Sequence, residues 1–239
     1  MEDLLVQKNK KPLSKNKTNF QIDLKAHFIK AIEADPIFSE AHLQLALLYQ
    51  EEGNIKNVEY HFNEAIQSDN KIAQDLDERG EELLKRFQFQ NAKEQFMKAQ
   101  EKKHHCAEVY FQQSKYFLNH KKTNEALESL SHSIEMNPTL SEVHRDYGIL
   151  LLQGNQIDNA RLHLEKSLDL NYGDSMSHFQ LGMIMVKMKD YEDAEQHFLS
   201  ALDIDPELVD CKVELVALKL ITDQKEEVKN ITKKTKKHT

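Results

Sequence analysis

The strongest constraint in this sequence is a repeat of 34 residues. One position recurs at that spacing through the chain, as Pro36, Asn70, His104, Pro138, Tyr172 and Pro206. If Ser39 is position 1 of the first full unit, position 8 is always small: Ala46, Gly80, Ser114, Gly148 and Gly182. No insertion or deletion interrupts this register between Leu24 and Val228. Such a period predicts an array in which each unit packs only on its neighbours.

Two helical stripes recur inside each unit. Positions 4, 7, 8 and 11 share one face of a first helix, and positions 20, 24 and 27 share one face of a second helix. The second stripe combines a small residue, a large one and another small one, as in Ala160, Leu164 and Ser167. Small residues let two backbones approach, the large residue fills the gap between hairpins, and prolines near position 32 end the second helix. The pattern predicts stacked helical hairpins with an inter-repeat turn near each position 32.

The chain resembles the tetratricopeptide repeat (TPR) family over roughly residues 20–230. The resemblance rests on three first-helix motifs: Leu45-Ala46-x-x-Tyr49, Tyr147-Gly148-x-x-Leu151 and Leu181-Gly182-x-x-Met185. They are followed by the second-helix spacing described above and by Pro138 or Pro206. The resemblance implies an all-α, right-handed superhelical solenoid of helix-turn-helix hairpins. Its concave face would be lined by the first helix of every repeat. The usual aromatic at position 4 is replaced in most repeats, which suggests softer packing.

The register divides the chain into three parts. Residues 1–19 are expected to form a flexible basic segment, residues 20–222 the solenoid, and residues 223–239 a polar capping helix with a basic tail. Within the solenoid, residues 20–38 form a half repeat, a lone second helix. Full repeats start near residues 39, 73, 107, 141, 175 and 209. The first helix that should precede the half repeat would carry Pro12 at its position 8, so we expect it to be absent.

Charge is spread unevenly along the chain. The formal net charge is −8, but residues 1–20 carry +3 and residues 225–239 carry +4, so the remainder carries −15. An acidic body disfavours nucleic acid as a ligand. The lysine-rich ends could contact RNA or anionic lipid, although charge runs at chain ends are most often simply solvated. No apolar run near the N-terminus suits a signal peptide or membrane span, so a cytoplasmic location is expected.

No catalytic, cofactor or metal site is expected. His104-His105-Cys106 offers zinc-ligand types in an expected inter-repeat turn, but no second Cys or His pair lies at a zinc-motif spacing. Six other histidines occupy only positions 4 and 23, and duplication explains them better than chemistry: His42, His144, His178, His61, His163 and His197. A cluster of acids in residues 75–82 should lie on an exposed helix, with solvated carboxylates. No nucleophile elbow or phosphate loop occurs, so the chain is not expected to be an enzyme.

The best-known ligand mode of the resembled family is a clamp for the C-terminal carboxylate of a chaperone. It uses first-helix positions 2, 5, 6 and 9 of three successive repeats and requires lysine, asparagine and arginine. No three consecutive repeats supply that set; positions 5 and 9 read Leu43/Leu47, Asp77/Glu81, Phe111/Lys115, Arg145/Ile149 and Phe179/Met183. A chaperone-tail receptor is therefore not indicated.

A second apolar stripe marks the expected first helix at residues 175–188. Phe179, Met183 and Val186 follow one another at i, i+4 and i+7, on a face other than the packing stripe. Neighbouring first helices extend this stripe, and basic residues rim it. The candidate partner-binding residues are Phe179, Met183, Val186, Ile149, Leu152, Arg145, Lys115, Phe111 and Val213. Alternatively, superhelical curvature or the basic C-terminal tail covers the stripe.

The sequence thus predicts an adaptor or scaffold that holds an apolar peptide or an amphipathic helix of another protein in a groove containing adaptable methionines. Two alternatives stay open. In one, the chain self-assembles, with the uncapped N-terminal helix or residues 1–6 docking on another copy. In the other, it is an accessory subunit of a larger complex whose lysine-rich ends contact nucleic acid or a membrane.

Overall fold

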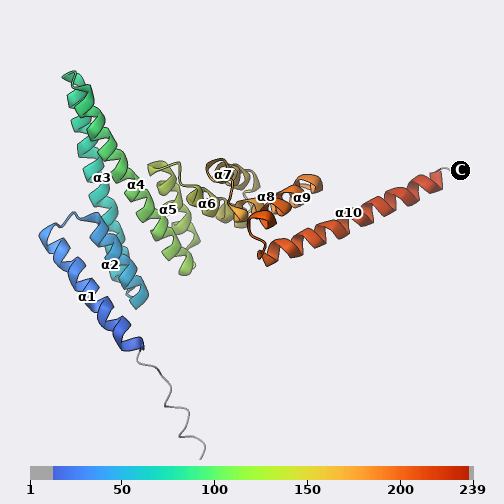
Figure 1. Cartoon of the computed structure of the whole chain (residues 1–239), viewed down its shortest axis with the longest axis horizontal. Helices are drawn as coiled ribbons and strands as arrows, with labels where there is room; N and C mark the ends of the chain where they lie inside the picture. The colour runs from blue at the N-terminus through green and yellow to red at the C-terminus, as the bar shows by residue number, and fades with distance from the viewer. Residues whose placement is uncertain (1–12, 237–239) are drawn as a thin grey trace, which may run out of the picture. The chain divides into compact units, whose positions relative to one another are not determined.

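A computed structural model describes the backbone of residues 13–236 and the side chains of residues 21–223. Every element in the described backbone is an α-helix (Figure 1), which confirms the all-α prediction. The helices are α1 (Leu13–Ala34), α2 (Ser39–Glu52), α3 (Ile55–Lys85), α4 (Phe89–Asn119), α5 (Thr123–Met136), α6 (Ser141–Gln153), α7 (Ile157–Leu170), α8 (Ser175–Met188), α9 (Tyr191–Ile204) and α10 (Val209–Lys236). They form two compact units, one ending at Lys121 and one beginning at Lys122.

The second unit follows the predicted hairpin register. Helices α6 and α7 pair with each other, as do α8 and α9, and each pair packs on the next helix in the chain. A Cβ atom built on Gly182 would lie 2.5 Å from Cε1 of Phe198, and one built on Gly148 would lie 2.8 Å from Cγ of Leu164. Positions 8 and 24 therefore meet at the closest point of each hairpin, as the small and large residues predicted.

A left-handed residue turns the chain inside each hairpin. Position 15 has a positive φ in the five repeats that form a hairpin turn there: Gly53, Phe87, Lys121, Asn155 and Lys189. Only Gly53 adopts this conformation without a Cβ penalty. The turn geometry is thus imposed by the hairpin rather than by residue preference, because phenylalanine, lysine and asparagine accept the same strained conformation.

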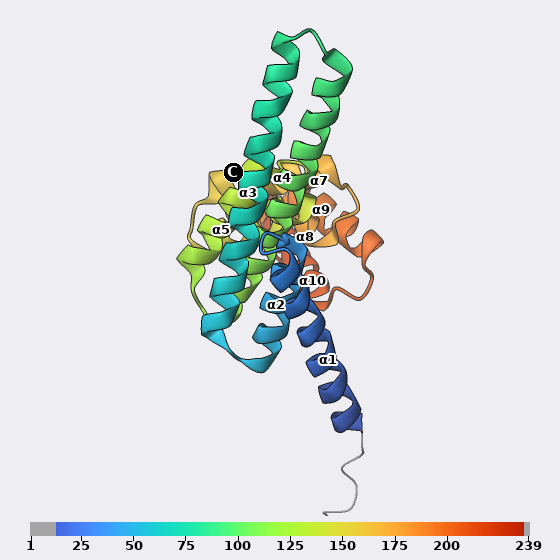
Figure 2. The same cartoon turned by 90° about the vertical axis from the view of Figure 1, so that its left-hand side faces the viewer.

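The first unit departs from the register. Helices α3 and α4 each run through a boundary between repeats, so the inter-repeat turns expected near Asn70 and His104 are wrong. Neither position holds the proline that stands at Pro36, Pro138 and Pro206, or the Gly173-Asp174 pair that follows Tyr172 at the one other boundary without proline, so no helix-ending signal occurs there. The second repeat is consequently drawn out into a two-helix arm made of the end of α3 and the start of α4 (Figures 1 and 2). We call residues 73–106 the α3–α4 arm.

Charged residues explain why this repeat leaves the stack. Positions 3, 7 and 10 of a first helix face the preceding repeat; they read Val143, Tyr147 and Leu150 on α6, and Ser177, Leu181 and Ile184 on α8, all buried or half-buried. In the second repeat they read Asp75, Arg79 and Glu82, and all three are exposed. These side chains offer no apolar stripe to bury against the first repeat, and unpaired charge is costly to bury.

The second half of α4 takes the vacated place. Its Tyr116, at position 10 of the third repeat, lies with its ring centroid 6.2 Å from that of Phe62, at position 24 of the first repeat. In the second unit the same two positions of adjacent repeats, Ile184 and Leu164, share one core cluster. The third repeat therefore stacks directly on the first.

A buried polar network joins α2, α3 and α4 at the base of the arm. The Asp69 carboxylate is 0% exposed and accepts hydrogen bonds from the Ser39 hydroxyl, at 2.6 Å, and from Nδ1 of His105. The other ring nitrogen of His105 lies 2.8 Å from a Glu40 carboxylate oxygen. The hydrogen bond to Asp69 raises the pKa of His105, and Glu40 raises it further. Burial has the opposite, smaller effect on this pKa. His105 and Cys106 thus lie inside a helix, not in the expected turn.

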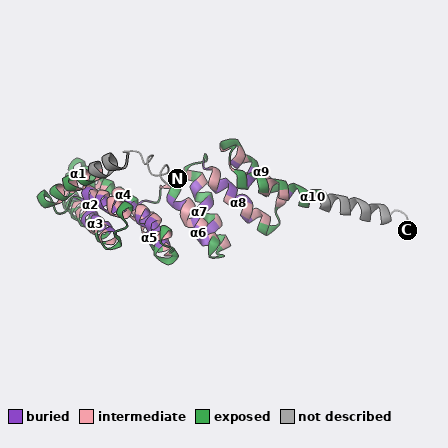
Figure 3. Ribbon diagram, turned by 90° about the horizontal axis from the view of Figure 1, so that it is seen from below, coloured by how far each residue is buried: buried purple, intermediate pink, exposed green. Residues whose placement is uncertain are grey.

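The C-terminal helix α10 runs from Val209 to Lys236 without a turn. Cys211, Leu215 and Leu218 pack it into a cluster that includes residues of α9. Figure 3 shows the start of α10 next to α9. The segment expected as a capping helix from residue 223 is helical, but it continues α10, and its side chains lie outside the described range beyond residue 223. Among the described residues, no helix combines the length and apolar character needed to cross a bilayer.

Candidate functional site

The predicted second stripe lies on α6, α8 and α10 of the second unit, and its members differ in exposure. Phe179 is 8% exposed, and its ring centroid lies 6.0 Å from that of Phe198, so this residue belongs to the core. Met183 and Val186 are half-buried against the same cluster, which includes α9 and α10 residues. Val213 is 60% exposed. The stripe therefore passes from core to open surface along its length.

The stripe residues on α6 are intermediate in exposure. Ile149 and Leu152 are half-buried and pack against a cluster that contains Leu164 and Leu181. Helix α6 contacts α8. The predicted residues of α6 and α8 thus lie on neighbouring helices of the second unit, although they pack against two different clusters.

Two further predicted residues lie in the first unit and form a pair of their own. Phe111 on α4 is 7% exposed, and the Lys115 ammonium nitrogen lies 3.8 Å from its ring centroid. This is a cation–π contact within one helix turn. The ammonium group therefore has a partner within its own helix.

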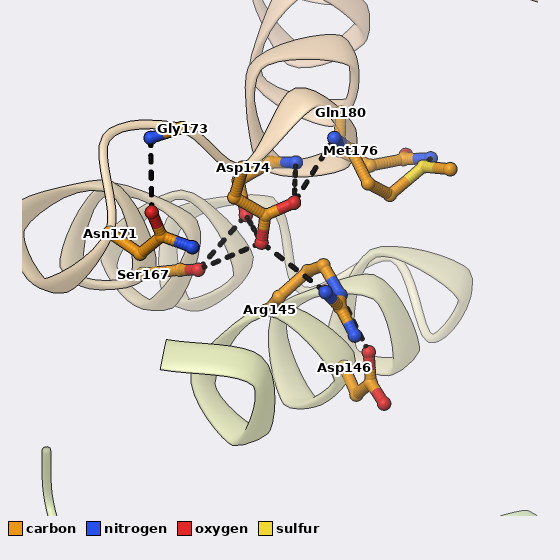
Figure 4. Close-up of polar contacts among 9 residues, drawn as sticks. Arg145, Asp146, Ser167, Asn171, Gly173, Asp174, Met176 and Gln180 are labelled. Atoms are coloured by element: carbon orange, nitrogen blue, oxygen red, sulfur yellow. Dashed lines mark hydrogen bonds and ion pairs between the residues drawn. The ribbon is translucent and has the colours of Figure 1, made fainter. Parts of the chain in front are cut away.

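Arg145, predicted on the rim, is held by two carboxylates (Figure 4). Its Nε donates to Asp146 at 2.9 Å, and its Nη1 lies 3.5 Å from Asp174. Burial alone would lower the pKa of the guanidinium, but Asp146 and then Asp174 raise it. Arg145 is thus fully charged and oriented by the fold, with its side chain 24% exposed.

Asp174 is the centre of this arrangement, and the sequence analysis missed it. The residue is 8% exposed and caps α8 by accepting the backbone N–H groups of Met176 and Ser177. Its second oxygen accepts the hydroxyl groups of Ser167 at 3.3 Å and Ser177 at 3.1 Å. An aspartate just before a helix is an N-cap signal that could have identified it. The network therefore joins α6, α7 and α8.

The histidines at positions 4 and 23 form three equivalent pairs. Their Nδ1 atoms lie 3.0 Å apart in His42–His61, 3.0 Å in His144–His163 and 3.2 Å in His178–His197. In each pair Nε2 of the position-4 ring lies near a backbone carbonyl, of Pro36, Pro138 or Tyr172, to which it must donate. Its Nδ1 is then the acceptor, and the position-23 ring donates. Each pair is therefore a neutral clamp between the two helices of one hairpin.

These clamps predict a loss of stability in acid. Burial, with smaller contributions from His42 and Lys25, lowers the pKa of His61 from 6.5 to about 4. Because the folded-state pKa lies below the unfolded value, the stabilisation is complete above pH 6.5 and is lost as the pH falls toward 4. We expect a loss of about 1 kcal/mol for this half-exposed pair, after discounting for solvent screening. Urea titrations between pH 7.5 and 4.5 measure it.

The variant His61→Gln supplies the control, because glutamine does not titrate in this range. It should lose less stability than the wild type over the same acid interval. The raised pKa of His105 acts in the opposite direction, since its contribution is fully present below its unfolded value and is lost as the pH rises. Both proteins keep His105, so this contribution cancels in the comparison. An unchanged pH slope in the variant would contradict the clamp.

No group of three His, Cys, Asp or Glu side chains in the described part of the chain could hold a metal ion. Cys106 and Cys211 are free and buried, and burial raises the pKa of their thiols to about 12 and about 11.

The hairpin that carries Met183 and the Asp174 cap matches a known repeat. Residues 175–208, which contain α8 and α9, match the family model of the tetratricopeptide repeat. This hairpin is a tetratricopeptide repeat. No match was found among curated proteins.

The chain is similar to several solved structures. MamA is 17% identical, with a TM-score of 0.52 over 82% of this chain and 95% of its own. YrrB, described as a TPR protein with an unusual peptide-binding site, is 18% identical, with a TM-score of 0.45 over 78% of this chain and 96% of its own. The first TPR of Spaghetti (RPAP3), bound to an HSP90 peptide, is 14% identical, with a TM-score of 0.47 over 49% and 95%. The likeness to MamA confirms the TPR-like fold.

Proposed function

We propose that this TPR protein is an interaction scaffold that binds an apolar peptide or an amphipathic helix of a partner protein along α6, α8 and α10. One observation supports the proposal most. Positions 9 and 12 of these three successive first helices are all apolar, and none is fully buried: Ile149 and Leu152, Met183 and Val186, Ala217 and Leu220. We call these six residues the α6–α8–α10 row.

The row has the properties of a protein-binding surface. In a stacked array, side chains that only hold the stack together are buried, as Leu181 and Ile184 are on α8. The row residues of α6 and α8 pack against the core but keep exposed surface, and Leu220 on α10 is 59% exposed. Methionine adapts its shape to a partner, and apolar anchors three or four residues apart suit a helix laid in a groove. Arg145, oriented by Asp146 and Asp174, supplies a fixed positive charge beside the row.

An array of amphipathic helical peptides tests the proposal. For a peptide that binds the wild type, fluorescence anisotropy then measures the Kd for the wild type and for the double variant Leu152→Ser, Met183→Ser. We expect its Kd to rise at least about tenfold, because two apolar contacts are lost. The matched control is Leu162→Ser on α7, a leucine that is 63% exposed and lies outside the row.

Circular dichroism and melting of both variants separate loss of binding from loss of fold. Equal affinity of the folded double variant and the control would refute the proposal. So would an array in which no peptide binds the wild type at micromolar concentration.

A further inference from the structure

The N-terminal helix α1 is a second helix without its first helix. Leu24, Phe28 and Ala31 stand at positions 20, 24 and 27, the face that meets the first helix of the same hairpin. The position-24 residues Phe62, Leu164 and Phe198 are 0% exposed, whereas Phe28 is only half-buried. Among the described helices, α1 packs on α2, which belongs to the next repeat. The hairpin face of α1 is therefore unpartnered within the described part of the chain.

The C-terminal helix α10 is a first helix without its second helix. Its Val216 stands at position 8 and is 59% exposed, whereas Ala46 at the same position is 0% exposed. Val209, Val213 and Leu220 continue this stripe at helical spacing and are 62%, 60% and 59% exposed. Because α10 runs to Lys236 without a turn, no residue up to Lys236 folds back over the stripe as a second helix.

The two unpartnered faces are complementary halves of one repeat. The α1 face carries a large residue followed by a small one, Phe28 and Ala31, like the second helices that cover position 8 elsewhere. The α10 face carries position 8 itself. Side chains are described for residues 21–34 of α1 and 209–223 of α10, so each face is described over about 20 Å. Each face thus fits the kind of partner that it lacks among the described residues of its own end.

We propose that α10 of one copy binds α1 of a second copy, so that the two lone helices complete a hairpin across the junction. The contact joins different faces of two identical chains, so a dimer keeps one free α1 face and one free α10 face. Because the contact is heterologous, further copies can add to these free faces. Leu220 belongs both to the α10 face and to the α6–α8–α10 row, but this proposal does not require the row to bind a ligand.

The expected association is weak. One helix pair buries less area than a standard protein interface, so it lies in the range of transient contacts. Val216 is also bulkier than the small residues at other position-8 sites, so the joined helices would pack at the ordinary spacing of about 8–10 Å rather than in the tight contact of Gly182 with Phe198. Assembly should therefore appear only at about 10–200 μM protein, where contacts of this size become populated.

Sedimentation velocity of the full chain with two single-end variants tests the proposal. Val216→Glu blocks the α10 end, and Phe28→Glu blocks the α1 end. The wild type should sediment as a concentration-dependent series, and each variant alone as a monomer. An equimolar mixture should form a dimer and nothing larger, because one intact α10 face meets one intact α1 face.

Matched controls lie on other faces of the same helices. Ile22→Glu on α1 and Ile221→Glu on α10 alter side chains that are 59% and 40% exposed, and both should assemble like the wild type. Melting curves show that every variant is folded; if Phe28→Glu unfolds α1, Leu24→Gln replaces it. Three results would overturn the proposal: a wild type that stays monomeric at 200 μM, a mixture that gives no dimer, or a Phe28→Glu protein that dimerises alone through α10.

Discussion

Replacing Gly182 by leucine is expected to lower the free energy of unfolding of the second unit by about 3 kcal/mol or more. Already a Cβ atom at this position would lie 2.5 Å from Cε1 and 2.6 Å from Cδ1 of Phe198. The Phe198 ring is 0% exposed and has no free space to swing into, so the two helices of the hairpin must separate. Urea unfolding followed by circular dichroism measures the loss.

The control for this prediction is Gly154→Ala. Gly154 ends α6 with φ −78°, and a Cβ atom there would meet nothing closer than 3.5 Å. Its free energy of unfolding should therefore stay within about 0.5 kcal/mol of the wild type. Similar losses in the two variants would show that glycine loss in general, and not the contact of positions 8 and 24, sets the stability.

Replacing Asp69 by alanine should destabilise the first unit by about 3–5 kcal/mol, the usual cost of removing one partner of a buried ion pair. The carboxylate is 0% exposed and is the common acceptor for Ser39 and His105, with the Lys102 ammonium nitrogen 3.5 Å away. Without it, these donors lose their partner at the junction of α2, α3 and α4. Urea unfolding, with hydrogen exchange of the α2 and α3 amides, measures the effect and locates it.

Asp75→Ala is the matched control, because it removes an aspartate from the same helix at an exposed position. We expect a change within about 0.5 kcal/mol. If Asp69→Ala were equally mild, or if it left α2 and α3 amides as protected as in the wild type, the network would not hold the base of the arm.

The sequence predicted the contacts inside hairpins well, because they depend on side-chain size at two fixed positions. Gly148 against Leu164 and Gly182 against Phe198 follow from a spacing that can be counted. The course of α3 and α4 was predicted wrongly, although the signal was present. Positions 3, 7 and 10 needed the same comparison across repeats, and Asp75, Arg79 and Glu82 stand out there at once.

The candidate site was harder to predict for a physical reason. Periodicity assigns Phe179 and Met183 to one stripe, but their exposure depends on how deeply α9 and α10 cover each of them, and Phe179 lies in the core. The setting of Arg145 depends on Asp174, a residue 29 positions away that reaches it only through the fold. Local pattern determines the face of a helix, whereas tertiary packing determines how much of that face remains accessible.

The α3–α4 arm gives one repeat an evolutionary freedom that the others lack. Its Gly80 still packs on Phe96, so that internal contact must persist for the arm to form. Asp75, Arg79 and Glu82, however, are exposed, so a mutation that changes their charge or shape should leave the stack intact. The aromatic pair at its end, Phe87 and Phe89, is 80% and 64% exposed and is not held in the core. Selection can therefore alter the surface of the α3–α4 arm independently, while the stacked repeats before and after it in the sequence stay unchanged.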